Sequence, residues 1–422
     1  MEEIVLESDG GISDAQLRRA LERSLAGRRD GLKKVLILPP DFTRMHSGAG
    51  KITAMYYELL KNVCKVEIMP AVGTHDPMNE AEISAFFPSV PKTLFLTHNW
   101  RTDVVRLGQV PGDYVGKVSA EISREPIDVE VDRRLLDPTY DLILSVGQVV
   151  PHEVVGMANY SKNIFIGCGG SSMIGQSHML GAFCGLENIM GRDKTPVRLV
   201  LDYAERMIEK IPLLYVLTVT TLSEGEVKLN GLFIGRKRRL FEEAVRLSQE
   251  KNITYVDRPL QKVVVFLDER EFKSTWLGNK AVYRTRMAIG SGGELVVLAP
   301  GVVKFGEDAV NDRLIRKYGY VGRKRVLEMC RTQRDLRQNL SVAAHLIHGS
   351  SDGKFGITYA VRHLTRKEIE SANFAYLPYE EAVRRYRPDR LREGYNRLEN
   401  GEEIYFIRNP ALGLWSTRDR FR

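Results

Sequence analysis

The chain has 422 residues, of which 43% are hydrophobic and 27% charged, as expected for a globular protein of about two domains. It has no apolar run of about 18 residues, so a membrane span is not expected, and its acidic start is typical of a first strand and not of a signal peptide. The formal net charge of +8 suits an anionic partner, either an acidic small molecule or nucleic acid, or else a solvated basic surface.

Strand-like apolar runs alternate with helical patterns along the first part of the chain, which is typical of α/β folds. The predicted elements, in chain order, are a strand at 34–38, a helix at 50–64, a strand at 66–72, a helix at 81–87, strands at 93–98 and 141–147, a helix at 196–211, and a hairpin of strands 214–222 and 227–234.

A domain boundary is predicted at Asp257-Arg258-Pro259, because a new strand–helix–strand series begins there. We therefore expect two α/β domains, 1–258 and 259–422, with mixed and parallel sheets flanked by helices, the second ending in an Arg-rich tail. The elements predicted for the second domain are strands at 262–267, 294–299 and 374–377 and helices at 278–288, 311–318, 325–336 and 378–386.

Polar side chains follow three of the predicted strands directly. The segment Asp41–Arg44 follows the first strand, His75 follows the second, and His152 follows the strand at 141–147. Because ligands in open α/β sheets collect at the carboxyl ends of the strands, these three places predict one common site.

The segment 41–44, Asp-Phe-Thr-Arg, offers groups for an anionic ligand. The planar fork of Arg44 suits a phosphate or a carboxylate. The alternative is that Asp41 and Thr43 only cap the following helix, a position that such residues prefer.

Eight histidines are present, and two of them stand out by their position. Histidine is the natural proton shuttle near neutral pH, so His75 and His152 are candidates for acid/base chemistry, although a single histidine is more often a satisfied polar residue. Five others are interpreted as structural or surface residues: His46, His98, His345, His348 and His363.

Lys162 and His178 lie behind His152 in the sequence. A solvated surface lysine is the commonest alternative for Lys162, but an amine at this place would also bind a phosphate or form a covalent link to a cofactor. His178 follows a turn of small residues, 167–172, that lets a flat ligand approach the backbone. A neutral imidazole is a good ligand for nickel, copper or zinc, so these residues alone leave the metal open.

Five features occur in the same order as in the lactate racemase family, which the chain resembles: segment 41–44, His75, His152, Lys162 and His178. The spacing of the last three also resembles that family. The resemblance implies a nickel-pincer nucleotide, a pyridinium mononucleotide whose two thioacid arms hold nickel. The roles that it implies are nucleotide contacts from Asp41, Phe42, Thr43 and Arg44, a covalent thioamide link at Lys162, nickel ligation by His178, acid/base roles for His75 and His152, and substrate binding by Arg44 and Lys280.

The same resemblance implies an isomerase, a racemase or epimerase of a 2-hydroxy acid that works by reversible hydride transfer to the cofactor. Domain 1–258 would hold the cofactor and the catalytic residues, and domain 259–422 would supply Lys280 to an active site in the cleft between the domains.

Three departures from the family pattern favour a substrate other than lactate. Ala158-Asn159-Tyr160 replaces a Ser-Gly-Gly stretch, Leu277 replaces a glutamine, and no tryptophan lies near Leu340. Arg284 and Arg286 would favour a larger or more anionic substrate; alternatively, they form a solvated helix face.

Two other classes of protein are kept as alternatives. The first is a zinc-dependent hydrolase or lyase that uses His75, His152 and His178. The second is a nucleic-acid-binding protein, which is disfavoured because the charge is spread along the chain and no recognition motif is present. We expect a small anionic substrate as the partner, neither nucleic acid nor a membrane, while the oligomeric state stays open. The four cysteines form no Cys-x-x-Cys pair and predict free thiols in a reducing cytoplasm.

Overall fold

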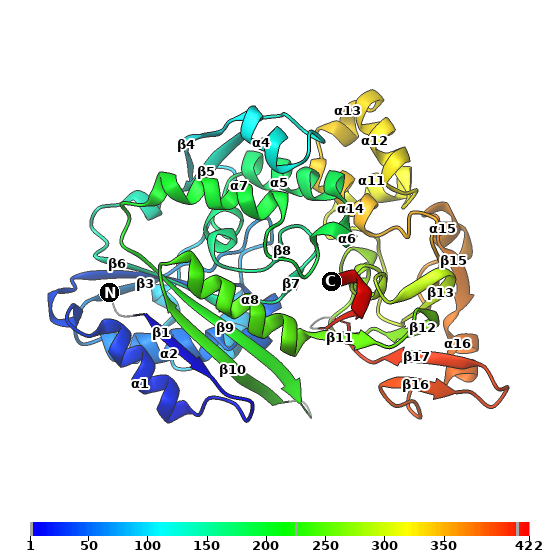
Figure 1. Cartoon of the computed structure of the whole chain (residues 1–422), viewed down its shortest axis with the longest axis horizontal. Helices are drawn as coiled ribbons and strands as arrows, with labels where there is room; N and C mark the ends of the chain where they lie inside the picture. Colours follow the sequence, from blue (N-terminus) through cyan, green and yellow to red (C-terminus); the bar gives the residue numbers. More distant parts are fainter. Residues whose placement is uncertain (1–2, 224–225, 411–412, 422) are drawn as a thin grey trace. The chain divides into compact units, whose positions relative to one another are not determined.

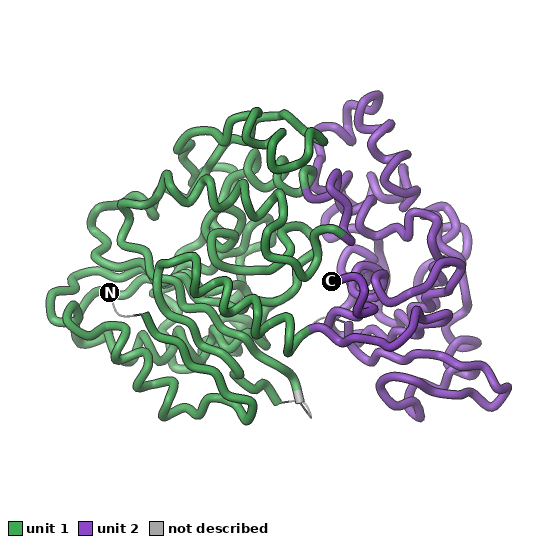
Figure 2. Tube along the Cα trace, viewed as in Figure 1, with its two compact units in different colours: residues 1–180, 188–252 green, residues 181–187, 253–422 purple. Residues whose placement is uncertain are grey.

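The computed structural model describes residues 3–223, 226–410 and 413–421 (Figure 1). The chain divides into two compact units, residues 1–180 with 188–252 and residues 181–187 with 253–422 (Figure 2). Strand β11 (Ile253–Val256) belongs to the second unit because it pairs with β18 (Leu414–Thr417). The units therefore divide after residue 252, six residues before the expected position at 258, and the short segment 181–187 also joins the second unit.

The first unit is built on a six-stranded mixed sheet in the order β1-β10-β9-β6-β2-β3. Strands β2, β3, β6 and β9 run parallel, and β10 and β1 continue the sheet antiparallel. All seven residues of β6 are buried, as expected for a parallel strand covered on both faces. The strands are β1 (Ile4–Glu7), β2 (Lys34–Leu38), β3 (Lys65–Ile68), β6 (Leu142–Gln148), β9 (Leu213–Ser223) and β10 (Glu226–Gly235).

Helices and short connections complete this unit. Those next to the candidate residues Asp41 and Lys162 are the 3-10 turn η2 (Phe42–Ser47) and the π-helix η5 (Asn163–Gly167). The α-helices are α1 (Asp14–Leu25), α2 (Ala49–Leu60), α3 (Glu80–Phe86), α4 (Gly112–Val118), α5 (Ser171–Cys184), α6 (Leu186–Ile189), α7 (Pro196–Glu205) and α8 (Arg238–Asn252). The predicted helix at 50–64 and the predicted hairpin of 214–222 with 227–234 are confirmed.

One predicted strand of this unit is wrong. Residues 93–98 were expected to be extended, but Lys92–Leu94 forms a 3-10 turn after Pro91, and a single bridge joins Phe95 to Ile68. Beyond that bridge the backbone leaves the sheet, and the His98 ring bonds to Asp132 instead.

Two small hairpins were not predicted. Strands β4 (Val104–Val110) and β5 (Ile127–Asp132) pair antiparallel, and so do the two-residue strands β7 (Pro151–His152) and β8 (Gly156–Met157). The second hairpin fixes the backbone at His152.

The second unit has its own six-stranded sheet, β15-β14-β13-β12-β17-β16, in which only β16 runs antiparallel to its neighbour. The expected Arg-rich tail is folded, since β17 lies inside this sheet. The strands are β12 (Leu260–Phe266), β13 (Ile289–Ala299), β14 (Gly356–Val361), β15 (Ala375–Pro378), β16 (Gly394–Arg397) and β17 (Glu403–Ile407).

The helix predicted at 278–288 is two shorter helices, because Asn279 interrupts it between α9 (Thr275–Gly278) and α10 (Lys280–Thr285). The remaining helices are α11 (Ala309–Tyr318), α12 (Arg323–Thr332), α13 (Arg334–Arg337), α14 (Leu340–His348), α15 (Arg366–Ser371) and α16 (Tyr379–Tyr386). No helix among the described residues is long and apolar enough to cross a membrane. The cysteines Cys64, Cys168, Cys184 and Cys330 are free, as predicted.

Candidate functional site

The carboxyl ends of β2, β3 and β6 lie side by side in the first unit, because β2 pairs with both of the other strands. Asp41 and its neighbours follow β2, His75 follows β3, and His152 follows β6. A bridge between Pro40 and Ala71 continues the pairing of β2 and β3 beyond the strands. The topology thus brings the three predicted positions to one edge of the sheet.

Asp41 and His75 form a hydrogen-bonded pair at this edge. His75 Nδ1 lies 2.5 Å from Asp41 Oδ2, and the other carboxylate oxygen accepts the Thr43 amide at 3.0 Å and the Thr43 hydroxyl at 2.5 Å. Burial alone would raise the pKa of Asp41, but the bond and charge of His75, with the charge of Arg44, hold that pKa well below its usual value. An ionised Asp41 accepts the Nδ1 proton and leaves Nε2 of His75 for proton transfer.

The residues of segment 41–44 also have structural contacts. Asp41 caps η2 and also holds His75, whereas the Phe42 ring packs edge-on against Phe86 at 6.4 Å between centroids. Thr43 is exposed and Arg44 is half-buried, so both remain accessible to an anionic group.

His152 has a different arrangement. The Val154 amide donates to His152 Nδ1 at 3.1 Å, so the neutral ring carries its proton on Nε2. Burial lowers the pKa of His152 well below its usual value; the Glu153 charge opposes the shift, and those of Lys162 and Arg44 add to it. The Glu153 carboxylate lies 3.8 Å from Nδ1 and is the nearby partner for a protonated ring.

Lys162 stands at the start of the π-helix η5. Just before it, Asn159 and Tyr160 have φ angles of 64° and 57°, which glycine adopts without strain and other residues at a cost of about 1–2 kcal/mol each. The backbone thus has a glycine-like conformation although the side chains are larger. The Tyr160 ring packs against Tyr215 at 4.3 Å and Phe241 at 5.1 Å between centroids, which helps to offset the strain.

The Lys162 amine is shielded from solvent and lies near charges of both signs. Burial, followed by the charge of Arg44, lowers the pKa of Lys162 to about 8. At this pKa roughly a tenth of the amine is neutral and nucleophilic at pH 7.

A fully buried arginine, Arg198 of α7, holds the loop before Lys162. Its guanidinium donates to the carbonyls of Met157 at 2.5 Å and Asn159 at 3.2 Å and to the Ser161 hydroxyl at 2.8 Å. Sequence reasoning missed Arg198, although an arginine among the apolar residues of Pro-Val-Arg-Leu-Val-Leu was a signal for a buried charge.

His178 lies on α5, and one of its ring nitrogens is held by the backbone of the same helix. Its Nδ1 lies 2.6 Å from the Ile174 carbonyl, to which it donates, so the lone pair of the neutral ring is on Nε2. Burial lowers the pKa of His178 to about 4, and the charge of Lys162 contributes, which also places the two groups within electrostatic reach.

These residues fit a nickel-pincer nucleotide. His178 supplies one neutral nitrogen ligand, Lys162 supplies a partly neutral amine, and Arg44 supplies positive charge. Among the described residues, no three histidine, cysteine, aspartate or glutamate side chains are grouped so that they alone would hold a metal ion.

The predicted substrate residue Lys280 lies in the second unit, on α10, with its amine 5.5 Å from the centroid of the Phe272 ring. Arg284 and Arg286 do not form the solvated face considered above, because both are buried. Arg286 lies 3.4 Å from both Glu187 and Asp352, so its charge is already paired within the protein.

The remaining histidines agree with their structural or surface interpretation. His363 is exposed, and the buried His345 ring stacks on Trp276 at 4.0 Å between centroids. His98 is buried within a polar network that includes Asp132 and Arg134.

The chain was compared with protein-family models, curated proteins and solved structures. Residues 12–188 match the family model of the lactate racemase N-terminal domain, a range that contains every predicted site residue except Lys280. The chain finds no match among curated proteins.

Two solved structures share the fold. A protein from Thermotoga maritima matches with a TM-score of 0.83 and 23% identity, over 98% of this chain and 100% of the other. The lactate racemase apoprotein from Thermoanaerobacterium thermosaccharolyticum matches with a TM-score of 0.70 and 15% identity, over 94% and 92% of the two chains. The first part of the chain is therefore similar to the lactate racemase N-terminal domain, and the chain shares the two-sheet α/β fold of these two structures.

Proposed function

We propose that the protein is a racemase or C2-epimerase of a 2-hydroxy acid and works with a nickel-pincer nucleotide. The observation that carries this proposal is the Asp41–His75 pair, which lies at the same strand edge as His152. Lys162 and His178 lie within electrostatic reach of one another behind that edge.

The protein's own residues have distinct duties in this proposal. When bound, the nucleotide supplies reversible acceptance of the Cα hydrogen as hydride. His75, oriented by Asp41, takes the proton of the substrate hydroxyl through Nε2. His152 serves the opposite enantiomer, and Glu153 is its partner when the ring is protonated.

Lys162 and His178 hold the cofactor. The Lys162 amine would be the point of covalent attachment, and Nε2 of His178, whose ring the Ile174 carbonyl orients, would offer a nitrogen ligand to nickel. Arg44 and Lys280 supply the positive charge that a carboxylate needs.

The preferred substrate in this proposal is a 2-hydroxy acid other than lactate, with a longer or more polar side chain. Leu277 has no hydrogen bond to give to such a substrate, so the carboxylate and hydroxyl depend on Arg44 and Lys280. Arg286 is not a candidate for this duty, because Glu187 and Asp352 already neutralise it.

The direct test is to produce the protein together with the enzymes that synthesise the cofactor and to measure its intact mass. The expected result is a mass increase that Lys162→Ala abolishes and that His178→Ala keeps while it loses nickel. The loaded protein is then assayed on a panel of 2-hydroxy and aldonic acids, each with hydrogen or deuterium at C2. A normal isotope effect on the best substrate is expected, and lactate as the best substrate would refute the inference from Leu277.

The zinc alternative is less well supported. It requires a protein site of several ligands, and the described residues offer no such group. Hydrolytic or lyase activity that depends on zinc, in protein free of nickel and nucleotide, would reverse this ranking.

A further inference from the structure

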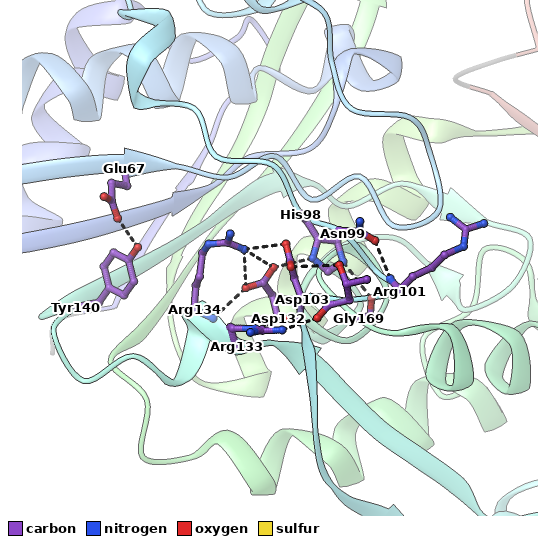
Figure 3. A network of polar contacts seen from close by, with 11 residues as sticks. Glu67, His98, Asn99, Arg101, Asp103, Asp132, Arg133, Arg134, Tyr140 and Gly169 are labelled. Atoms are coloured by element: carbon purple, nitrogen blue, oxygen red, sulfur yellow. Dashed lines mark hydrogen bonds and ion pairs between the residues drawn. The ribbon is translucent and has the colours of Figure 1, made fainter.

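A buried histidine outside the candidate catalytic set is bonded at both ring nitrogens. His98 Nδ1 lies 2.8 Å from Asp132 Oδ2, and its Nε2 lies 3.1 Å from the carbonyl of Gly169 (Figure 3). The side chains of His98 and Asp132 are both 0% exposed. Each partner is a hydrogen-bond acceptor, so a ring that makes both bonds carries a proton on each nitrogen.

The charge of this ring is balanced inside the network. Asp132 also receives the Arg134 guanidinium at 3.0 Å and 3.2 Å and the Arg134 amide at 2.9 Å (Figure 3). Arg134 in turn lies 3.4 Å from Asp103. The carboxylates of Asp132 and Asp103 thus face the cations of His98 and Arg134. Asp132 holds the His98 ring at Nδ1, and Nε2 is directed to the Gly169 carbonyl.

Gly169 belongs to the turn that joins the Lys162 segment to the His178 helix. The turn has little freedom to shift: Asp132 donates its amide to the Cys168 carbonyl at 2.8 Å, and Gly169 bridges to Val131 of β5. A Cβ at Gly169 would lie 1.9 Å from the Phe165 carbonyl oxygen, so only glycine allows this close approach.

The same turn is also tied to the loop that carries His75. Gly73, which lies two residues before His75, donates its amide to the carbonyl of Gly167 at 2.8 Å. A displacement of the turn would therefore reach Lys162, His178 and His75 together.

We infer that His98 is a positioning residue: through Nε2 it fixes the 167–170 turn and with it the relative placement of Lys162 and His178. The claim that His98 helps to place Lys162 and His178 for the cofactor rests on the proposed function. The claim that His98 fixes the 167–170 turn does not. His98 touches neither substrate nor cofactor in this assignment, and Asp132 with Arg134 sets its orientation.

Two substitutions separate positioning from general core stability. His98→Gln retains a donor at the place of Nε2, facing Gly169, whereas His98→Asn retains a donor at the place of Nδ1, facing Asp132. Both variants lose one bond and the ring, so a purely structural role predicts similar behaviour. The exposed residue His363 provides the control, His363→Gln.

The first measurement is amide hydrogen exchange of peptides covering 163–178 in the unloaded protein, which is independent of the proposed function. We expect His98→Asn to exchange about 10- to 100-fold faster there, the factor for loss of a hydrogen bond from a charged donor, and His98→Gln to stay close to wild type. Equal exchange in the two variants would overturn the inference.

The second measurement is the mass increase at Lys162 and nickel retention after production with the cofactor-synthesis enzymes. We expect His98→Gln to retain both and His98→Asn to lose them in part. A wild-type protein that takes up no nucleotide would contradict the proposed function and leave the exchange result intact.

A third measurement needs no variant, in case either one fails to fold. Nitrogen-15 spectra of the wild-type histidine rings should show one ring protonated at both nitrogens and protected from solvent. A His98 ring with only one proton would overturn the inference, because one of its two bonds would then be absent.

Discussion

Two histidine–aspartate pairs lie in the first unit, and in each pair the partners are 34 positions apart in the sequence. His75 Nδ1 is 2.5 Å from Asp41, and His98 Nδ1 is 2.8 Å from Asp132. The His75 side chain is 50% exposed, whereas that of His98 is 0% exposed. The pairs differ at the second ring nitrogen. In His98, Nε2 is hydrogen-bonded to the Gly169 carbonyl, whereas the bond between His75 and Asp41 uses only Nδ1 and leaves Nε2 for proton transfer.

This difference shows that a histidine–aspartate pair does not by itself indicate catalysis. A ring whose second nitrogen has no protein partner can exchange protons with a ligand, whereas a ring whose second nitrogen bonds to a carbonyl holds the backbone. Substitutions at the two pairs should therefore affect different properties, activity at one and stability at the other.

The largest effect is expected at the half-exposed pair. His75→Ala should reduce turnover of the best substrate by about 10²–10⁴-fold, the usual contribution of a general acid or base. The free energy of unfolding should fall by less than at the fully buried pair, because the His75 side chain is 50% exposed and Thr43 still donates to Asp41. Steady-state kinetics and chemical unfolding of the same preparations measure both.

His46, on the same turn η2 as Arg44, provides the control for this variant. His46→Ala should retain near-wild-type turnover. If His75→Ala did the same, His75 would not be the base.

The buried pair should show the reverse pattern. His98→Ala leaves Asp132 with one cation fewer and the Gly169 carbonyl without its ring donor, so the free energy of unfolding should fall by about 3–5 kcal/mol. Chemical unfolding of the unloaded protein measures this change. The exposed His363→Ala should stay within about 0.5 kcal/mol of wild type. An equally small change in His98→Ala would mean that the buried network does not stabilise the fold.

The positions of the functional residues were predictable because they follow from strand periodicity. Buried runs such as 34–38 and 141–147 are visible as strands, and the residues after them must lie at the strand ends. The topology then brings them together without further information.

The partners of those residues were not predictable, because they depend on contacts between distant segments. The Asp41 carboxylate holds His75, 34 residues away, a contact that the sequence did not indicate. Residues 93–98 have the composition of a strand, yet tertiary bonds of His98 prevail over that propensity. Arg284 and Arg286 fit a solvated helix in pattern, but α10 is buried, and the charge of Arg286 is neutralised by Glu187, which is 99 positions earlier.

A milder substitution tests how far Asp41 supports His75. Asp41→Asn retains an oxygen for the Thr43 amide but removes the charged acceptor of His75 Nδ1. Loss of a hydrogen bond to a charged group is worth about 1.5–3 kcal/mol, so turnover should fall by about 10- to 100-fold. Thr43→Val removes only the hydroxyl donor to Asp41 and should have a smaller effect. Equal losses in the two variants would show that Asp41 acts through the turn and not through His75.

The smallest effect is expected from a change at Glu153, the neighbour of His152, whose Nδ1 accepts from the Val154 amide instead of donating to an aspartate. Burial keeps the pKa of His152 well below its usual value, and the charge of Glu153 opposes that shift. Glu153→Gln should lower this pKa further, so the protonated ring becomes rarer at neutral pH. Each pKa unit corresponds to a tenfold change in that population, and turnover should fall by about three- to tenfold.

The pH dependence gives the sign of this last effect. Protonated His152 is populated only when the pH falls towards its lowered pKa, so the deficit of Glu153→Gln should shrink as the pH is lowered. Profiles of kcat/KM for wild type and variant from acidic to neutral pH measure it, and the covalent mass at Lys162 shows that cofactor loading is unchanged. A deficit that stays constant with pH would mean that Glu153 positions the loop and does not tune the proton affinity of His152.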